Sequence, residues 1–296
     1  MAKKPQHVFL IDGSGFIFRA YYGIKADMTN PAGTPVNAVF GFTKMVMKLI
    51  DDTNADHIAI MFDKARKTFR SDIYAEYKAN RGAPPDDLIP QFDLVRDAAK
   101  ALNVVALDMD GYEADDLIAT YTRQAREQGA DVTIVSSDKD LMQLIGQCAD
   151  DEPEDGVTSG GCIDMLDTMK NARIYIEEVE EKFGVTPEKV GDVLALMGDS
   201  VDNIPGIFGV GPKTASKLIA EHGGLTAALD AADGMKKSKL KERLIEHRAD
   251  AELSRVLVTL REDCSLPVTL EDMKLDEVPP EPLAAFLGKH GFTSLL

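Results

Sequence analysis

Acidic residues follow four short apolar runs in the first half of the chain. Asp12 comes directly after the run 8–11, and Asp63 comes directly after the run 58–62. Continuous runs rich in valine and isoleucine are typical of parallel strands, whose carboxyl ends meet at one edge of a sheet. The same edge would receive the carboxylates that follow the other two runs. Those runs, 104–107 and 132–135, lead to Glu113, Asp115, Asp116, Asp138 and Asp140.

Carboxylates gathered at one sheet edge predict a site for divalent metal ions. Like charges within about 4–6 Å of one another oppose ionisation, so these side chains would repel strongly. Mg²⁺ and Mn²⁺ relieve such crowding and prefer sites made of oxygen atoms. Taken one at a time, each residue also suits a turn or a helix cap, where aspartate is common. The joint pattern favours metal ions over seven separate caps.

A glycine-rich turn in the second half of the chain predicts a site for phosphates. Three glycines lie within residues 206–211, here called the glycine hairpin, and Pro212 suits the first position of a helix. Backbone N–H groups at a helix start bind phosphate, and lysines lie close by. This is the helix–hairpin–helix pattern, and the alternative is a tight turn between packed helices. The residues expected to contact DNA are Gly206, Gly209, Gly211, Lys213, Thr214 and Lys217.

Clusters of positive charge occur in a chain whose formal net charge is −17. Such an acidic protein does not attract nucleic acid through its overall field, so binding would depend on basic patches or metal ions. Segment 64–81 holds six basic and two acidic residues, with Phe69, Tyr74 and Tyr77 among them. This composition is typical of a surface that stacks on bases and contacts phosphates. A second basic segment, 236–248, is equally consistent with a solvated face.

Strand-like and helical segments alternate through residues 1–176, which predicts an α/β domain with a mostly parallel central sheet. Short helical segments separated by glycine and proline follow at 177–266, where we expect an all-helical domain. We expect 267–296 to be a tail or linker and the acidic stretch 146–161 to be a surface loop. Every apolar run is shorter than the ~18 residues of a membrane-spanning helix, so no membrane association is expected.

These motifs together resemble the 5′ nuclease family, in particular the 5′→3′ exonuclease domains that precede bacterial DNA polymerases. The resemblance covers nearly the whole chain in order. It implies a PIN-like core flanked by helices, a helical arch at about 64–92 and a helix–three-turn–helix domain. Besides the glycine hairpin, the matching motifs are Asp12-Gly-Ser, Arg19-Ala-Tyr, Phe62-Asp63, Thr68-Phe-Arg70, Tyr77-Lys78 with Arg81, Glu113-Ala-Asp115-Asp116, Asp138-Lys-Asp140 and Met197-Gly-Asp199.

The resemblance also implies a role for each matching residue. Arg19, Lys78 and Arg81 correspond to catalytic positions that act on the scissile phosphate, and Arg70 and Tyr77 to positions that contact DNA. The glycine hairpin would bind duplex DNA, with a K⁺ ion on its backbone carbonyls. The first of two Mg²⁺ or Mn²⁺ ions would be held by Asp12, Asp63, Glu113, Asp115 and Asp116, and the second by Asp138, Asp140, Asp199 and Asp202.

The activity implied is 5′→3′ exonuclease and 5′-flap endonuclease cleavage of nicked or branched DNA by two metal ions, in primer removal and repair. RNA primers paired to DNA are a further substrate, and a cytoplasmic, nucleoid-associated bacterial monomer is expected. Because the chain ends at Leu296, it would be either a fragment whose parent chain carries a polymerase domain or a standalone relative. Two alternatives stay open: a non-catalytic, structure-specific DNA-binding module, and a metal-dependent RNase of the PIN group.

Overall fold

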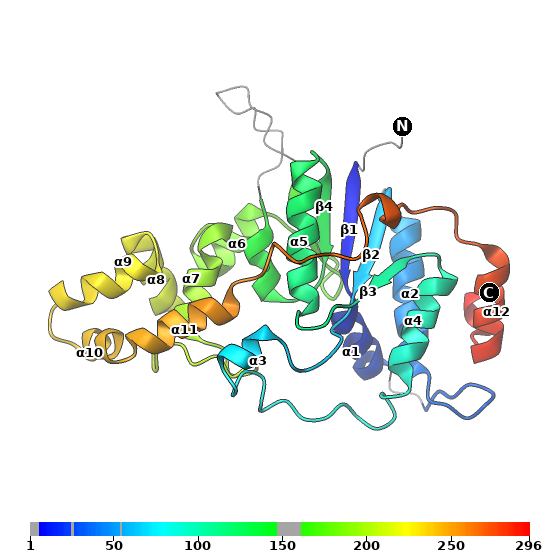
Figure 1. Cartoon of the computed structure of the whole chain (residues 1–296), viewed down its shortest axis with the longest axis horizontal. Coiled ribbons are helices and arrows are strands. Elements are labelled where there is room, and N and C mark those ends of the chain that lie inside the picture. Colours follow the sequence, from blue (N-terminus) through cyan, green and yellow to red (C-terminus); the bar gives the residue numbers. More distant parts are fainter. Residues whose placement is uncertain (1–5, 25–26, 54, 147–160) are drawn as a thin grey trace.

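A computed structural model describes residues 6–24, 27–53, 55–146 and 161–296. Most of the predicted acidic loop, residues 147–160, therefore lies outside the described residues. The described strands are β1 (His7–Asp12), β2 (His57–Met61), β3 (Val105–Leu107), β4 (Asp131–Val135), β5 (Ile163–Asp167) and β6 (Ala172–Ile174). They form one sheet in the order β3-β2-β1-β4-β5-β6, parallel except for β6, which pairs antiparallel with β5 (Figure 1).

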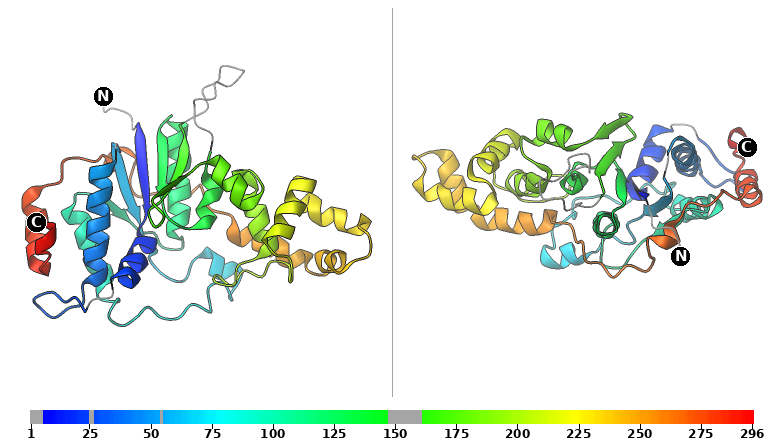
Figure 2. Two further views of the ribbon diagram at one scale, coloured as in Figure 1. Left: turned by 180° about the vertical axis from the view of Figure 1, so that it is seen from behind. Right: turned by 90° about the horizontal axis from the view of Figure 1, so that it is seen from above.

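Helices cover both faces of the sheet, which explains why its strands are apolar throughout (Figure 2). Along β1, Phe9 and Ile11 pack into one core cluster, whereas Val8 and Leu10 pack into another on the opposite face. The helices on the Phe9 side are α1 (Gly13–Gly23), α2 (Asn37–Asp52), α4 (Gln91–Ala101) and α12 (Pro280–His290), and α5 (Ala114–Glu127) covers the Val8 side.

The predicted helical domain follows β6, and its core is continuous with the core on the Val8 side of the sheet. The same buried cluster that contains Leu10 also contains Val193, Leu218 and Leu257. Within the described residues, no helix is both long enough and apolar enough to span a membrane. The helices of this domain are α6 (Ile176–Phe183), α7 (Pro187–Met197), α8 (Pro212–His222), α9 (Leu225–Asp230), α10 (Lys239–Glu246) and α11 (Arg248–Val258). A mostly parallel sheet followed by a helical domain confirms the predicted fold class.

The segment expected to form a helical arch consists mainly of turns and irregular chain. In residues 64–90, all of which are described, α3 (Phe69–Ile73) is the only helix. Pro84 and Pro85 cannot extend a helix, because proline lacks the backbone N–H and crowds the preceding turn. The segment passes from β2 to α4 by way of the helical domain (Figure 1). It is therefore an irregular strap with one short helix.

Residues 267–296 pack against the sheet and its helices, where a tail or linker had been expected. The backbone N–H of Leu275 donates a hydrogen bond to the carbonyl of Asp56 at 2.8 Å. Further along, Phe286 and Phe292 are buried in the cluster on the Phe9 side of the sheet. The apolar side chains of α12 recur every three or four residues, which gives this short helix a buried face. The C-terminal segment is thus part of the core on the Phe9 side of the sheet.

Candidate active site

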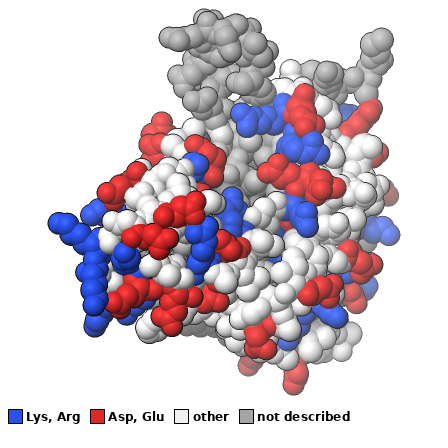
Figure 3. All heavy atoms as spheres, turned by 60° about the vertical axis from the view of Figure 1, so that its left-hand side comes forward, with Lys and Arg blue, Asp and Glu red and all other residues white. Residues whose placement is uncertain are grey.

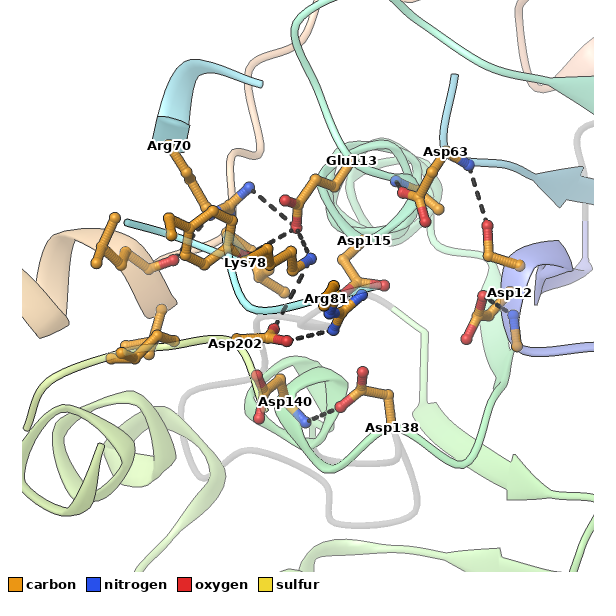
Figure 4. Close-up of a pocket in the computed structure, with 18 of the residues that line it drawn as sticks. Asp12, Asp63, Arg70, Lys78, Arg81, Glu113, Asp115, Asp138, Asp140 and Asp202 are labelled. Carbon is orange, nitrogen blue, oxygen red and sulfur yellow. Dashed lines mark hydrogen bonds and ion pairs between the residues drawn. The ribbon is translucent and has the colours of Figure 1, made fainter. Parts of the chain in front are cut away.

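A cavity of about 200 Å³ lies at the carboxyl ends of β1, β2 and β4, where the strap and the helical domain meet the sheet. Figure 4 shows acidic side chains pointing into it from several elements, with the basic side chains of Arg70, Lys78 and Arg81 beside them. The charged residues that line it are Asp12, Asp63, Arg70, Lys78, Arg81, Glu113, Asp115, Asp138, Asp140 and Asp202. The sequence prediction that these carboxylates share one sheet edge agrees with this geometry.

Several of these carboxylates are held in place by helix starts. Asp12 precedes α1 and accepts a hydrogen bond from Gly15 N at 2.8 Å. Asp138 precedes the 3₁₀ helix η1 (Lys139–Leu144) and accepts from Asp140 N at 2.9 Å. From the sequence, capping a helix and lining a metal site were alternative roles for these aspartates. In the structure the same side chains cap helices and line the cavity. Capping occupies one oxygen of each carboxylate and fixes the orientation of the side chain at the edge of the cavity.

Three of the carboxylates resist ionisation because they are crowded and partly removed from water. Burial, with Asp63 and Asp138 close by, raises the pKa of Asp12 to about 6. Burial and the charge of Asp138 raise the pKa of Asp140 to about 7 and that of Asp115 well above its usual range. Within the described residues, Oδ1 of Asp140 is buried without a hydrogen-bond partner. An unpartnered buried carboxylate oxygen is costly unless a cation completes it.

The donor set fits divalent metal ions, although no complete set of ligands is gathered in advance. In the part of the chain that the structure describes, no three acidic, histidine or cysteine side chains already surround one point as metal ligands. Mg²⁺ usually keeps several of its water ligands, so a few carboxylates suffice for each ion. The lining carboxylates that take part in no ion pair among the described residues are Asp12, Asp63, Asp115, Asp138 and Asp140.

Asp116 is not among the residues that line the cavity, so this arrangement does not support its predicted role as a metal ligand. Its two carboxylate oxygens each accept a 2.7 Å hydrogen bond from Arg70, and both side chains are almost fully buried. Asp116 also accepts from the backbone N–H groups of Glu113 and Arg261 at 3.0 and 2.9 Å. Arg70 in turn donates to the carbonyls of Leu257 and Thr259. Arg70 is therefore a buried structural partner, and this position does not support its predicted contact with DNA.

Glu113 is bound within the protein by side chains from the strap, including Arg70, which lies 3.6 Å away. Its Oε2 accepts hydrogen bonds from Tyr77 Oη at 3.1 Å and from Lys78 Nζ at 2.9 Å. Burial opposes the charge of Lys78, but Glu113 and Asp202 outweigh it and raise the pKa of the lysine. Tyr77 is only 6% exposed, so its predicted contact with DNA does not agree with its position. Lys78 and Glu113 form an ion pair at the wall of the cavity.

The loop before the glycine hairpin contributes Asp202 to the cavity and leaves Asp199 outside its lining. Asp202 forms ion pairs with Arg81 and, at 3.8 Å, with Lys78. Burial opposes ionisation of Asp199, but a 2.5 Å hydrogen bond from Lys139 Nζ outweighs it and lowers the pKa of Asp199. Asp199 thus forms an ion pair with Lys139, whereas the unpaired carboxylates of the cavity have no such partner among the described residues.

Arg19 lies apart from the cavity that the other predicted site residues line. Its guanidinium donates to the hydroxyl of Thr168 and, at 2.8 Å, to the carbonyl of the same residue, in the turn between β5 and β6. It is not among the residues that line the cavity. The carboxylate of Asp12 lies at the start of α1, whereas Arg19 is more than one turn further along that helix. Its predicted catalytic position is not supported by this arrangement.

Two serines that position the carboxylates were not singled out from the sequence. Ser14 Oγ accepts a hydrogen bond from Asp63 N at 3.1 Å. Ser136 Oγ donates to Asp12 at 2.9 Å and accepts from Asp138 N at 3.0 Å. Ser14 therefore links the start of α1 to the backbone of Asp63, and Ser136 links the carboxylate of Asp12 to the backbone of Asp138. Their placement directly beside the aspartates, in Asp12-Gly-Ser and Ser-Ser-Asp138, is the sequence signal that could have identified them.

The glycine hairpin forms the predicted turn between two helices. It leads from α7 into α8, which begins at Pro212 directly after Gly211. Gly206 is buried, and its backbone N–H donates to Ser254 Oγ at 2.9 Å. Lys213 and Lys217 are exposed on the first turns of α8, and Thr214 is partly exposed. The free N–H groups and the lysines are therefore available to an anionic partner.

Comparisons with known families cover almost the entire chain. The family described as 5′-3′ exonuclease, N-terminal resolvase-like domain, matches residues 7–184. The family described as 5′-3′ exonuclease, C-terminal SAM fold, matches residues 185–281. The chain is 47% identical to DNA polymerase I of Rhizobium leguminosarum over 99% of its own length, and 37% identical to DNA polymerase I of Bacillus caldotenax over 100%. It spans only 28% and 32% of those two polymerases.

Solved structures share the fold at low sequence identity. The T5 5′-exonuclease with bound zinc ions matches 86% of this chain and 89% of its own, with a TM-score of 0.69 and 21% identity. The catalytic core of Rad2 in complex with a DNA substrate matches 97% of this chain and 88% of its own, with a TM-score of 0.58 and 15% identity. With both domains matched in order along its sequence, the chain belongs to the 5′-3′ exonuclease family.

Proposed function

We propose that this protein hydrolyses DNA phosphodiester bonds at 5′ ends and 5′ flaps with the help of two divalent metal ions. The observation that carries the proposal is the cavity lined by five carboxylates that have no basic partner among the described residues. A purely structural role does not require unpaired carboxylates to face one another. Membership of a nuclease family and the exposed lysines beside the glycine hairpin support DNA as the substrate.

The unpaired carboxylates would hold the metal ions, and their positions suggest two groups. Asp12, Asp63 and Asp115 come from the sheet edge and α5, whereas Asp138 and Asp140 come from η1. Bound divalent ions would lower the pKa of the attacking water and stabilise the leaving oxygen. Ser136 would hold the two groups together, because it hydrogen-bonds to Asp12 of the first and to Asp138 of the second, and Ser14 would fix Asp63 beside Asp12 within the first group. Lys78 and Arg81 would contact the scissile phosphate from the opposite wall.

Replacement of Lys78 with methionine is expected to slow cleavage by about 10²–10³-fold, because the charge that stabilises the phosphate in the transition state is lost. In the free protein Lys78 is bound to Glu113, so a substrate phosphate would compete for it. Single-turnover cleavage of a flap substrate measures the effect. Lys64→Met is the matched control, since Lys64 pairs with exposed Asp110 outside the cavity. Equal losses in both variants would contradict a specific role for Lys78.

The proposed substrate geometry combines a duplex and a free 5′ strand. The T5 relative is described as a flap endonuclease in complex with DNA and metal ions, and it shares this fold. Here the glycine hairpin would hold the duplex, because it presents helix N–H groups and lysines without base-specific contacts. Since the curated relatives are DNA polymerases, we place the activity in primer removal and repair, with RNA paired to DNA as a second substrate.

The decisive experiment is cleavage of an end-labelled 5′-flap duplex with Mg²⁺, with EDTA as the metal-free control. We expect cuts near the junction that require the metal ion. The same assay separates the alternatives. Tight binding of the flap without cleavage in Mg²⁺ or Mn²⁺ would indicate a non-catalytic DNA-binding module. Metal-dependent cleavage of single-stranded RNA, with the DNA flap left intact, would indicate an RNase.

A further inference from the structure

An aromatic side chain stands exposed at the glycine hairpin and takes no part in the site described above. Phe208 is 73% exposed, the largest exposed fraction among the large hydrophobic side chains of the described residues. Its neighbours in the hairpin behave differently, since Ile207 and Val210 are only 1% and 3% exposed. The hairpin therefore buries the apolar side chains on either side of Phe208 and directs this ring to the surface.

The backbone of the hairpin is fixed, so the exposure of the ring is set by the fold. Ile207 N donates to the carbonyl of Leu196 at 2.8 Å, which attaches the hairpin to the end of α7. Val210 N donates to the carbonyl of Ile207 at 2.9 Å, and Gly206 N to Ser254 Oγ at 2.9 Å. Gly209 has a φ of +76°, a conformation that favours glycine. Phe208 is thus presented by a turn anchored on both sides.

One basic side chain lies over the ring, and others are exposed on the helix that follows the hairpin. The guanidinium of Arg243, from α10, lies over the ring with its central carbon 5.3 Å from the ring centroid. Lys213 and Lys217 are exposed on α8, which starts immediately after the hairpin. Figure 3 shows basic side chains gathered along the outer edge of the helical domain. An apolar ring among cations matches a partner that offers both negative charge and apolar surface, and the DNA backbone does so through its phosphates and deoxyriboses.

We propose that Phe208 packs against the deoxyriboses of the bound duplex, while Lys213 and the N-terminus of α8 bind the adjacent phosphates. The inference rests on the proposed function. The contact of Phe208 with the sugars would contribute a part of the DNA affinity that does not depend on salt concentration. A sugar contact is expected rather than base stacking, because the bases of an intact duplex are already stacked. Such a contact reads no sequence, because the deoxyriboses are the same at every base pair.

The test separates contact with sugars from attraction to phosphates by means of salt. The dissociation constant of a 5′-flap duplex is measured at several salt concentrations, with Ca²⁺ replacing Mg²⁺ so that binding is followed without cleavage. Phe208→Ala is expected to weaken binding roughly tenfold at every salt concentration, because an aromatic contact area is lost. Lys213→Ala is expected to reduce the slope of log K against log salt by about 1. Met169→Ala, another exposed apolar residue, serves as the control.

The outcomes are distinguishable from failure of the proposed function. Phe208→Leu is expected to retain most of the affinity, and Met169→Ala is expected to bind and cleave the flap as the wild type does. If Phe208→Ala binds as well as the wild type while Lys213→Ala binds more weakly, the sugar contact is refuted and the nuclease proposal stands. If Phe208→Ala changes the salt slope as Lys213→Ala does, the ring acts only by holding the cations, and the inference is again refuted. Wild-type protein that neither binds nor cleaves the flap would refute both proposals.

Discussion

Replacement of Arg70 with alanine is expected to lower the free energy of unfolding by about 3–5 kcal/mol, because it leaves the buried carboxylate of Asp116 without its cation. The pair has both 2.7 Å hydrogen bonds and no access to water. Arg70 also binds the carbonyls of Leu257 and Thr259, so the strap, α5 and the end of α11 would loosen together. Urea unfolding followed by circular dichroism measures the loss.

Two further variants separate this explanation from a surface role. Lys67→Ala is the matched control, since Lys67 is exposed on the same segment and lies 3.7 Å from Asp72. Its effect on stability is expected to stay within about 0.5 kcal/mol. The double variant Arg70→Met with Asp116→Leu is expected to recover much of the stability, because a buried ion pair can be replaced by apolar side chains. Arg70→Ala that folds as stably as the wild type but binds DNA poorly would contradict the buried role.

The basic segment 64–81 shows that a local sequence pattern can miss ion pairs with distant residues. Its composition predicted a surface for DNA, but most of its charges meet acids from distant parts of the chain. Arg70 pairs with Asp116, 46 positions away, and Arg81 pairs with Asp202, 121 positions away. A count of charges within a segment does not include partners that only the fold supplies. The strap is consequently far less basic in the structure than in the sequence.

The carboxylate cluster was predictable because its cause is local. Asp12 and Asp63 stand at the ends of apolar strands, and Asp115, Asp138 and Asp140 follow two further strands after short connections. The topology of a parallel sheet brings all these positions to one edge. The pattern could not separate Asp115 from Asp116, which are adjacent in sequence but differ by about 100° around α5. One faces the cavity and the other faces Arg70. The C-terminal segment was misjudged for a similar reason, because the prolines at the start of α12 obscured its buried face.

Replacement of Asp140 with asparagine is expected to reduce cleavage by at least about 10³-fold while making the metal-free protein more stable at pH 8. Burial and Asp138 raise the pKa of Asp140 from 3.8 to about 7. The folded chain therefore binds a proton more tightly than the unfolded chain does, and the stability that this proton contributes is lost as the pH rises through 7. Asparagine carries no charge and avoids the loss, so we expect a gain of about 2 kcal/mol at pH 8.

The same reasoning predicts how metal ions and pH act together on the wild type. Asp12 shares the raised pKa, so without divalent ions the wild-type melting temperature should fall between pH 5 and pH 8. Mg²⁺ should restore it at pH 8 and act weakly at pH 5, where protons already occupy the carboxylates. Asp72→Asn, which alters an exposed carboxylate on α3, should leave cleavage and both responses unchanged. Wild-type stability that is independent of both pH and Mg²⁺ would contradict a crowded metal site. In such a site the unpaired carboxylates repel one another, so the folded protein binds a proton or a cation more tightly than the unfolded chain does.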